Sequence, residues 1–258
     1  MEDYVVTIGI FDGLHAGHKK IINETVNLAK LLNSKSMLMS FSNNPKKDNG
    51  IIRQKKILSD SLFKEIINEL KVDKHYIIDF SSEISKISGR DFIQKLCSEY
   101  HVKALVVGQS FRCGYPPLSL GAYDLKTQLS VYNPNSDVKI VPPVIVDGIE
   151  VSSTALRKYI SDGDFYSFHR FAGYFYILDL SGLSYEKDED GFVYYLGTSV
   201  QIIPKDGKYR VYAKDKASFL SMSSPRDYDF KAVISDSGRC LKLYVPFKPA
   251  NISFLIGE

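Results

Sequence analysis

The pattern of apolar segments changes once along the chain, and this change predicts two domains of different architecture. From residue 4 to about residue 170, short apolar runs alternate with longer segments whose apolar residues recur at helical spacing. The predicted strands cover 5–10, 36–41, 75–80, 104–107 and 138–146, the last one broken by Pro142-Pro143, and the predicted helices cover 19–32, 60–70 and 88–100. This alternation is typical of an α/β fold in which helices cover both faces of a mainly parallel sheet.

Beyond about residue 172 the chain consists of short aromatic and β-branched runs that Gly, Asp, Asn and Ser separate. The predicted strands are 174–178, 192–196, 200–203, 209–212 and 242–245, with a hairpin turn at 205–208. Regularly spaced short strands indicate a small, mainly β domain that is barrel-like or a sandwich. A boundary between Phe168 and Gly173 gives predicted domains of residues 1–172 and 173–258.

Composition narrows the class of protein. A net charge of +3 is too small to indicate a nucleic-acid surface. The three cysteines are odd in number and far apart, which fits a reducing cytosol and neither a disulfide framework nor a metal knuckle. The acidic N-terminus leads directly into a predicted strand, unlike a signal peptide, and no apolar run is long enough to span a bilayer. We therefore expect a cytoplasmic protein without nucleic-acid or membrane partners, whose oligomeric state stays open.

The segment from Gly9 to His18 joins the first predicted strand to the first predicted helix. Anions bind at helix starts, because backbone N–H groups there lack helical partners and the helix dipole is positive. Gly13 and Gly17 allow a tight turn and a close approach of backbone to ligand. The two imidazoles, His15 and His18, could be surface groups or half of a metal site, but no cluster in the sequence completes a metal site. The segment therefore predicts phosphate binding, and we assign no metal ligand.

Two further segments have a structural and a functional interpretation each. Ser152 to Arg157 is either a capped helix start or a phosphate cradle, in which Arg157 offers planar, bidentate donors. Val106 to Gly114 is either an ordinary strand-exit loop or part of a second substrate pocket, with Gly108 admitting a planar ligand and Ser110 donating a hydrogen bond.

Together these three segments resemble, in the same order, the motifs of the bacterial bifunctional riboflavin kinase/FAD synthetase family. Gly9 to His18 is similar to G-x-F-D-G-x-H-x-G-H, and Gly108 to Gly114 is similar to G-x-[DN]-F-x-F-G. Ser152 to Arg157, followed by Asp162-Gly163-Asp164, is similar to S-S-T-x-I-R and a G-D helix turn. The resemblance covers residues 4 to 172 and implies a Rossmann-like nucleotidyltransferase domain.

The activity that the resemblance implies is FMN adenylyltransferase: AMP passes from ATP to FMN, which gives FAD and pyrophosphate. Mg²⁺ would be bound mainly through phosphate oxygens and water. The phosphate of FMN would be the nucleophile, and His15, His18 and Arg157 would be catalytic. The implied ATP-binding residues are Gly9, Phe11, Asp12, Gly13, His15, Gly17, His18, Ser153, Thr154 and Arg157. The implied flavin-binding residues are Asn44, Gly108, Ser110 and Phe111.

The chain also departs from the family pattern. Asn44 stands where F-x-P-H-P has its histidine, Ser110 replaces an Asp or Asn, and Cys113 replaces an aromatic residue. The kinase stretch G-x-P-T-A-N does not occur after residue 172, so we expect a degenerate kinase-like β domain without riboflavin kinase activity. Two alternatives remain: a nucleotidyltransferase with a different phosphate acceptor, and a non-catalytic flavin or nucleotide sensor.

Overall fold

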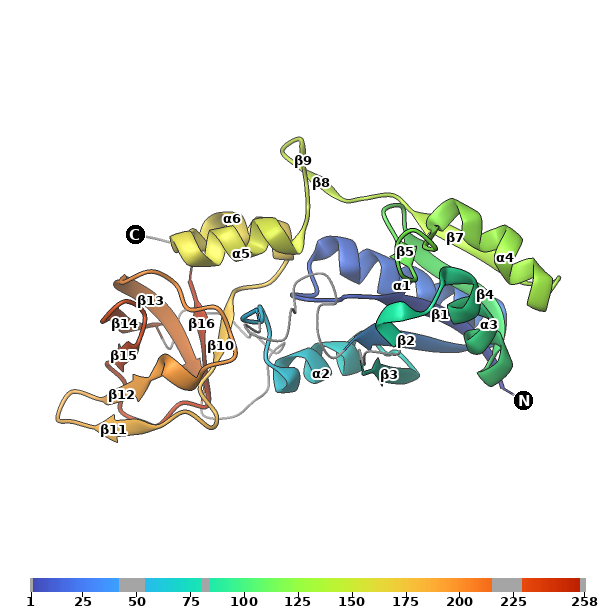
Figure 1. Ribbon diagram of the computed structural model, residues 1–258. Helices are drawn as coiled ribbons and strands as arrows, with labels where there is room; N and C mark the ends of the chain where they lie inside the picture. The colour runs from blue at the N-terminus through green and yellow to red at the C-terminus, as the bar shows by residue number, and fades with distance from the viewer. Residues whose placement is uncertain (1, 42–53, 80–83, 215–228, 256–258) are drawn as a thin grey trace. The chain divides into compact units, whose positions relative to one another are not determined.

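The computed structural model describes residues 2–41, 54–79, 84–214 and 229–255, and it divides into two compact units (Figure 1). The first unit contains Met1–Phe11, Gly17–Gln54 and Ile67–Val144. The second contains Asp12–Ala16, Lys55–Ile66 and Ile145–Glu258. Each unit is therefore built from segments that are distant in sequence. The division of the chain into domains of residues 1–172 and 173–258 stays a prediction.

The first unit is built around a five-stranded sheet with the order β3-β2-β1-β4-β7. All its neighbouring strands pair in parallel. Its strands are β1 (Asp3–Gly9), β2 (Lys35–Phe41), β3 (Lys74–Ile78), β4 (His101–Gly108) and β7 (Asp137–Val141). The three central strands are almost continuously buried, as expected for a parallel sheet covered on both faces. The predicted α/β architecture is confirmed, including the break of the last strand at Pro142-Pro143.

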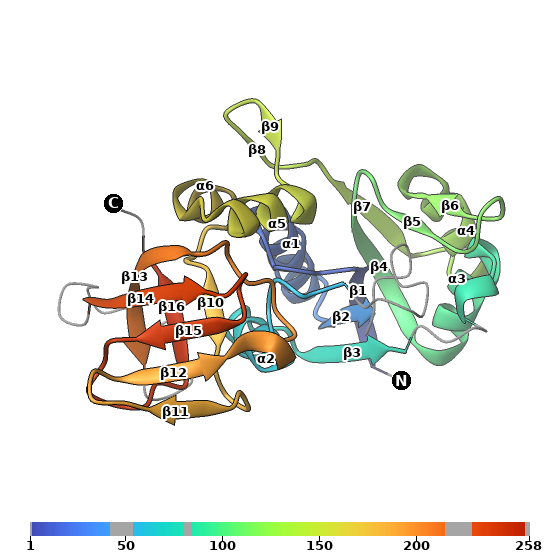
Figure 2. The ribbon, with the colours of Figure 1, turned by 60° about the vertical axis from the view of Figure 1, so that its left-hand side comes forward.

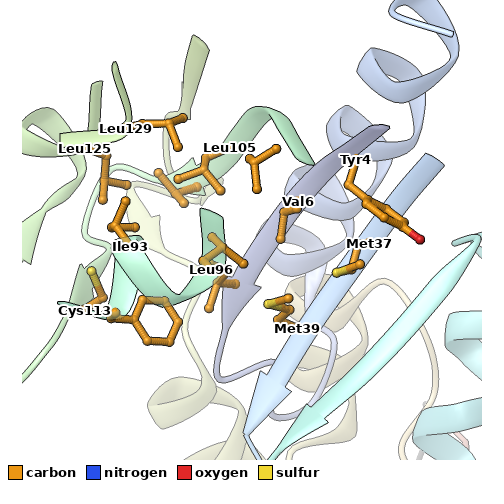
Figure 3. Close-up of a cluster of buried hydrophobic side chains, with 14 of the residues drawn as sticks. Tyr4, Val6, Met37, Met39, Ile93, Leu96, Leu105, Cys113, Leu125 and Leu129 are labelled. Carbon is orange, nitrogen blue, oxygen red and sulfur yellow. The ribbon is translucent and has the colours of Figure 1, made fainter. Parts of the chain in front are cut away.

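Side chains alternate between the two faces of this sheet. Val6, Met37 and Leu105 lie in a buried cluster with residues of two helices, α3 (Gly89–Glu99) and α4 (Leu125–Tyr132), as Figure 3 shows. Val5 and Ala104 belong to a separate cluster that includes Ala29 of α1 (Ala16–Leu31). The remaining elements of the first unit are η1 (Ile84–Lys86), β5 (Arg112–Cys113), β6 (Leu120–Gly121) and η2 (Ala122–Asp124), while α2 (Asp60–Glu69) spans residues of both units. In the part of the chain that the structure describes, no helix is both long and apolar enough to cross a bilayer.

The strand order creates a topological switch point between β1 and β4. From β1 the chain proceeds outward to β2 and β3, and it then returns to the other side of β1 to form β4 and β7. In open α/β sheets, ligands bind beyond the carboxyl ends of the strands at such a point. β1 ends at Gly9 and β4 ends at Gly108, where two of the sequence motifs begin. The topology therefore places the start of each motif at the edge of the sheet where ligands are expected.

The second unit contains a curled, antiparallel sheet of seven strands with the order β10-β16-β13-β14-β15-β12-β11 (Figure 2). Its strands are β10 (Ile177–Asp179), β11 (Tyr185–Lys187), β12 (Phe192–Tyr195), β13 (Gly207–Lys214), β14 (Asp229–Ser235), β15 (Cys240–Leu243) and β16 (Asn251–Phe254). The other elements are β8 (Ile145–Val146), β9 (Ile149–Glu150), α5 (Ser153–Asp162), α6 (Phe165–Ala172) and η3 (Leu196–Thr198). The predicted mainly β, barrel-like architecture is confirmed.

Two local predictions in this unit are wrong. Residues 200–203 do not form a strand of the sheet, because Gln201 makes an isolated bridge to Lys56 instead. Residues 205–208 are not a hairpin turn, since Gly207 already begins β13 and no strand directly precedes it. The Asp206 carboxylate accepts hydrogen bonds from the backbone N–H groups of Ser237 and Gly238, at 2.9 and 2.7 Å. Tertiary contacts therefore override the local strand signal in the first segment and the local turn signal in the second.

An aromatic core attaches α6 to the β sheet of the second unit. The ring of Phe165 stacks on Phe254 with a centroid distance of 4.4 Å, and Phe168 meets Tyr176 edge-on at 5.4 Å. α5 and α6 are joined at Gly163, whose backbone is left-handed with φ of 71°. Because α6 is fixed in this way, α5 and its Ser153 and Arg157 are anchored to the same unit.

Replacing Leu105 by alanine tests the core of the first unit. Leu105 is fully buried in the centre of β4. Leu105→Ala removes buried apolar surface and leaves a cavity, so we expect a loss of about 2–5 kcal/mol in unfolding free energy. Leu31, at the end of α1, is 82% exposed, and Leu31→Ala is the matched control with an expected change below about 0.5 kcal/mol. Equal losses in chemical denaturation would contradict this packing.

Candidate nucleotide site

The first unit holds Gly9, Phe11, Gly17 and His18 of the predicted phosphate segment. α1 begins at Ala16, three residues earlier than predicted, so His18 lies in its first turn. The ring of Phe11 is buried and meets the His18 imidazole edge-on, with ring centroids 5.3 Å apart. A Cβ at Gly9 would lie 3.4 Å from the Phe11 ring. Packing of Phe11 therefore sets the orientation of the His18 ring at the positive end of a helix.

The loop after β4 also belongs to the first unit. The backbone N–H of Phe111 donates to the Gly108 carbonyl at 2.9 Å, which closes a tight turn around the exposed Ser110. A Cβ at Gly108 would approach Ile21 of α1 to 3.2 Å. Phe111 is half-buried against the core cluster. Asn44 lies outside the described residues, and the flavin-binding roles of all four residues stay predictions.

The second unit brings Asp12, Ser153 and Arg157 together. The Asp12 carboxylate forms an ion pair with the Arg157 guanidinium, and both side chains are largely buried, with 18% and 15% of their surface exposed. The same carboxylate accepts a hydrogen bond from the backbone N–H of Ile57 at 3.2 Å. The Ser153 hydroxyl donates to the Asp12 carbonyl at 2.8 Å, and Arg157 also donates to the Lys55 carbonyl at 2.5 Å. Asp12 is thus the centre of a polar network.

Gly13 and Leu14 have backbones in the left-handed region, with φ of 80° and 38°. A Cβ at Gly13 would lie 2.8 Å from Cδ1 of Ile57, so this position combines a glycine conformation with a close approach. The Gly13 carbonyl accepts a hydrogen bond from the hydroxyl of Tyr174. Gly13 is therefore required for the packing of the loop, whether or not a ligand approaches its backbone.

His15 is buried, with 7% of its surface exposed. Burial lowers the pKa of its imidazole to about 4, so His15 is neutral at pH 7. A neutral imidazole can still donate one N–H to a phosphate oxygen, but it contributes no positive charge. His15 would therefore act as a hydrogen-bond donor, and positive charge has to come from other groups.

The start of α5 fits the capping interpretation. The Ser152 hydroxyl accepts a hydrogen bond from the Ala155 backbone N–H at 3.3 Å, so Ser152 is the N-cap. Thr154 is exposed in the first turn of the same helix. The phosphate-cradle interpretation stays a prediction, because capping and anion binding use the same helix terminus.

Sequence reasoning missed the residues that hold the loop of residues 12–16. Lys55 and Ile57 lie 43 and 45 residues after Asp12, and Tyr174 lies in a predicted strand. No local pattern marks them, because Lys55 and Ile57 act through backbone groups and Tyr174 through one hydroxyl. Their contribution becomes visible only when tertiary contacts are known.

The sheet order and the loop at its switch point define a class, an α/β protein of the nucleotide-binding kind. A family model described as FAD synthetase matches residues 1–155, which is more than half of the chain. The chain belongs to the FAD synthetase family. This confirms the resemblance that the motifs indicated.

Curated relatives agree with this family. The bifunctional riboflavin kinase/FMN adenylyltransferase of Buchnera aphidicola subsp. Acyrthosiphon pisum is 29% identical over 168 residues, which cover 62% of this chain and 51% of the relative. The protein of that description from Listeria monocytogenes is 27% identical over 175 residues, which cover 67% of this chain and 54% of the relative. The chain spans about half the length of these relatives.

One solved structure has the same fold over both units. The crystal structure described as a macrolide-efflux protein from Streptococcus pneumoniae superposes with a TM-score of 0.81 and 20% identity, covering 98% of this chain and 84% of the other. At this level of identity the likeness concerns the fold alone. It supports the combination of a Rossmann-like sheet with a curled β sheet in one chain.

Gly13→Ala tests the fit of the loop against Ile57. The left-handed backbone costs any L-residue about 1–2 kcal/mol, and the clash with Ile57 adds about 1–3 kcal/mol. Gly148 is the matched control in the same unit, because its φ is 76° and a Cβ there would meet nothing within 4 Å. We expect Gly13→Ala to lower the unfolding free energy more than Gly148→Ala does. Ile57→Val, which removes Cδ1, should recover part of the difference; equal losses in the two glycine variants would contradict the contact.

The buried His15 predicts a pH dependence of stability. Its pKa is about 4 in the folded chain and 6.5 when unfolded, so between these values the unfolded state binds more protons. Stability is therefore fully present above pH 6.5 and is lost as the pH falls towards 4, by about 3 kcal/mol. Denaturation of the wild type and His15→Gln from pH 7 to pH 4 isolates this effect. A constant difference between the two proteins would contradict burial of a neutral imidazole.

Proposed function

We propose that this chain is an FMN adenylyltransferase, which transfers AMP from ATP to FMN and releases pyrophosphate. One observation carries the proposal: the segment Gly9 to His18 follows β1 at the switch point and puts His18 in the first turn of α1. The family match covers this segment, and the relatives described as FMN adenylyltransferases support the reaction.

The reaction requires little covalent work from the protein. A phosphate oxygen of FMN attacks the α-phosphorus of ATP, and the bond from that phosphorus to the bridging oxygen of pyrophosphate breaks. Catalysis then consists of positioning and of neutralising the charge on phosphate oxygens. In this proposal His15 and His18 donate N–H groups to the phosphates. The helix dipole at the start of α1 adds positive potential beside His18.

Arg157 would offer charge-assisted hydrogen bonds to the phosphates, while Asp12 balances its net charge. Its contacts with Asp12 and Lys55 use two of the five N–H donors of a guanidinium. The other N–H groups of the guanidinium would donate hydrogen bonds to the triphosphate of ATP. Gly9, Phe11, Asp12, Gly13, Gly17, Ser153 and Thr154 complete the proposed ATP site.

The residues at the site suit an anion better than a bare metal ion. Within the described ranges, no group of three or more His, Cys, Asp and Glu side chains could hold a metal. The Asp12 carboxylate is engaged by Arg157 and the Ile57 N–H. Mg²⁺ would fit as an ion that arrives with ATP, bound through phosphate oxygens and water, where it would neutralise phosphate charge.

The proposal also includes a binding site for FMN and the absence of riboflavin kinase activity. Gly108, Ser110 and Phe111 would line the flavin site beside the carboxyl end of β4. Asn44, which lies outside the described residues, is a further proposed flavin-binding residue. Residues 1–172 would form the nucleotidyltransferase domain, and residues 173–258 a kinase-like β domain without kinase activity. The chain would act in the cytoplasm, without nucleic-acid partners.

Because Ser110 and Cys113 depart from the flavin loop of the family, a nucleotidyltransferase that uses another phosphate-bearing acceptor is the second candidate function.

Incubation with ATP, Mg²⁺ and FMN is expected to yield FAD, whereas ATP, Mg²⁺ and riboflavin should yield no FMN.

His18→Ala should lower turnover by about 10²-fold, which corresponds to about 2.7 kcal/mol of transition-state stabilisation. His101 is the matched control, because it lies at the amino end of β4, beside Asp3. Flavin products are separated by chromatography.

The outcomes separate the candidates. No FAD from the wild type rejects the proposed function, and pyrophosphate release with another acceptor would favour the second candidate. A His18→Ala variant within about threefold of the wild type, like His101→Ala, would reject the catalytic role of His18.

A further inference from the structure

The loop of residues 12–16 belongs to the same compact unit as the C-terminal β sheet. It carries His15, and it includes two residues with left-handed backbones, Gly13 and Leu14. Leu14 is fully buried although its φ of 38° is unfavourable for a leucine. Such a conformation persists only where surrounding contacts determine it. Contacts from residues outside the loop must therefore hold it in this conformation.

One contact comes from Tyr174, which lies three residues before the start of β10. Tyr174 is buried, and its ring packs edge-on against Phe168 of α6 with a centroid distance of 5.5 Å. Its hydroxyl donates to the Gly13 carbonyl. Burial raises the pKa of this hydroxyl well above its usual value, so it stays a donor. The aromatic core of the second unit thereby fixes the backbone of the loop next to His15.

A second contact runs through Gln201. Its side chain is 1% exposed and makes three hydrogen bonds. The amide nitrogen donates to the carbonyls of Ile57 and Ile177, at 3.0 and 2.8 Å, and the amide oxygen accepts from the Asp179 N–H at 2.8 Å. Gln201 therefore ties the segment around Ile57 to β10.

Backbone bonds and two serines reinforce this junction. The Lys56 N–H donates to the Val200 carbonyl at 2.7 Å, and the Ile202 N–H donates to the Lys56 carbonyl at 2.9 Å. The Asp179 carboxylate accepts from the Ser59 hydroxyl at 2.6 Å, and also from Ser61. Residues 55–61 are thus held by the segment around Gln201 and by Asp179 of β10.

Residues 55–61 in turn hold the loop of residues 12–16, which is called the phosphate loop below. The Ile57 N–H donates to the Asp12 carboxylate, and the Lys55 carbonyl accepts from Arg157, the ion-pair partner of Asp12. A continuous set of contacts therefore runs from β10 through Gln201 and Ile57 to Asp12. It meets the direct contact of Tyr174 at the neighbouring residue, Gly13.

We propose that the C-terminal β domain supports the phosphate loop of adenylyl transfer, with Tyr174 and Gln201 as positioning residues. The inference rests on the proposed function only for its effect on turnover. It gives the β domain a function that requires no kinase chemistry. When these contacts are lost, His15 and Asp12 move from their positions, and the ATP phosphates are held less well.

A pair of hydroxyl deletions in the same unit tests the inference. Tyr174→Phe removes the hydroxyl that donates to the Gly13 carbonyl. Tyr194→Phe is the matched control, because Tyr194 is also buried and its hydroxyl donates to the Pro249 carbonyl at 3.0 Å, away from the loop. Both changes keep the ring, and thermal denaturation checks that both proteins are folded. Gln201→Glu is the second variant, since it keeps the acceptor for Asp179 and removes the two donated bonds.

Two readouts follow the loop. Amide hydrogen exchange of residues 13–16 should accelerate about tenfold in Tyr174→Phe and in Gln201→Glu, and stay unchanged in Tyr194→Phe. The kcat/KM for ATP should fall about tenfold in the first two variants, with the KM for FMN within about twofold of the wild type. A purely structural role would instead lower thermal stability in all three variants without a selective effect on ATP.

The two proposals fail in different ways. A wild type that forms no FAD rejects the proposed function, while the exchange comparison still decides the positioning role. Exchange of residues 13–16 that is equal in Tyr174→Phe and Tyr194→Phe overturns the positioning role, whether or not FAD forms. Normal ATP kinetics in both Tyr174→Phe and Gln201→Glu overturn it as well.

Discussion

The carboxylate of Asp12 is the group on which the geometry of the candidate site depends. A largely buried carboxylate is stable only when charges and hydrogen bonds compensate its desolvation, and Arg157 and the Ile57 N–H do so here. Removal of either partner would leave a charge poorly solvated. The loop that carries His15 is therefore fixed by electrostatics at one residue and by steric fit at the next, Gly13, whose missing side chain admits Ile57.

Burial of this loop also limits the chemistry that its histidine can perform. A neutral His15 donates a hydrogen bond without adding charge, so the net charge of a bound triphosphate must be balanced elsewhere. Because Asp12 already balances the charge of Arg157, the start of α1 and an ion that accompanies the nucleotide are the remaining sources of positive charge. The two histidines of one short motif consequently differ in role: His15 is set in the loop by its burial, and His18 lies in the helix, oriented by Phe11.

Local sequence signals were sufficient for most of the fold. Apolar runs marked the strands of the first sheet, and Ser88 and Ser152 marked the starts of α3 and α5. The failures have a common physical origin. Val200 to Ile203 has the composition of a strand, but the side chain of Gln201 bonds to residues far away in sequence and its backbone pairs with Lys56. Likewise, the groups that fix Asp12 belong to residues without any motif, since a backbone N–H is present at almost every position.

The same logic explains how a β domain can contribute to a reaction without containing its catalytic groups. A strained loop has many alternative conformations of lower local energy, and only distant contacts select the one that presents His15 correctly. Tyr174 and Gln201 provide such contacts with uncharged, buried donors, which are insensitive to pH and salt. These donors do not depend on the stretch G-x-P-T-A-N, which does not occur in the sequence after residue 172. The β domain then only has to stay folded and to hold residues 55–61 in place, whatever its own surface binds.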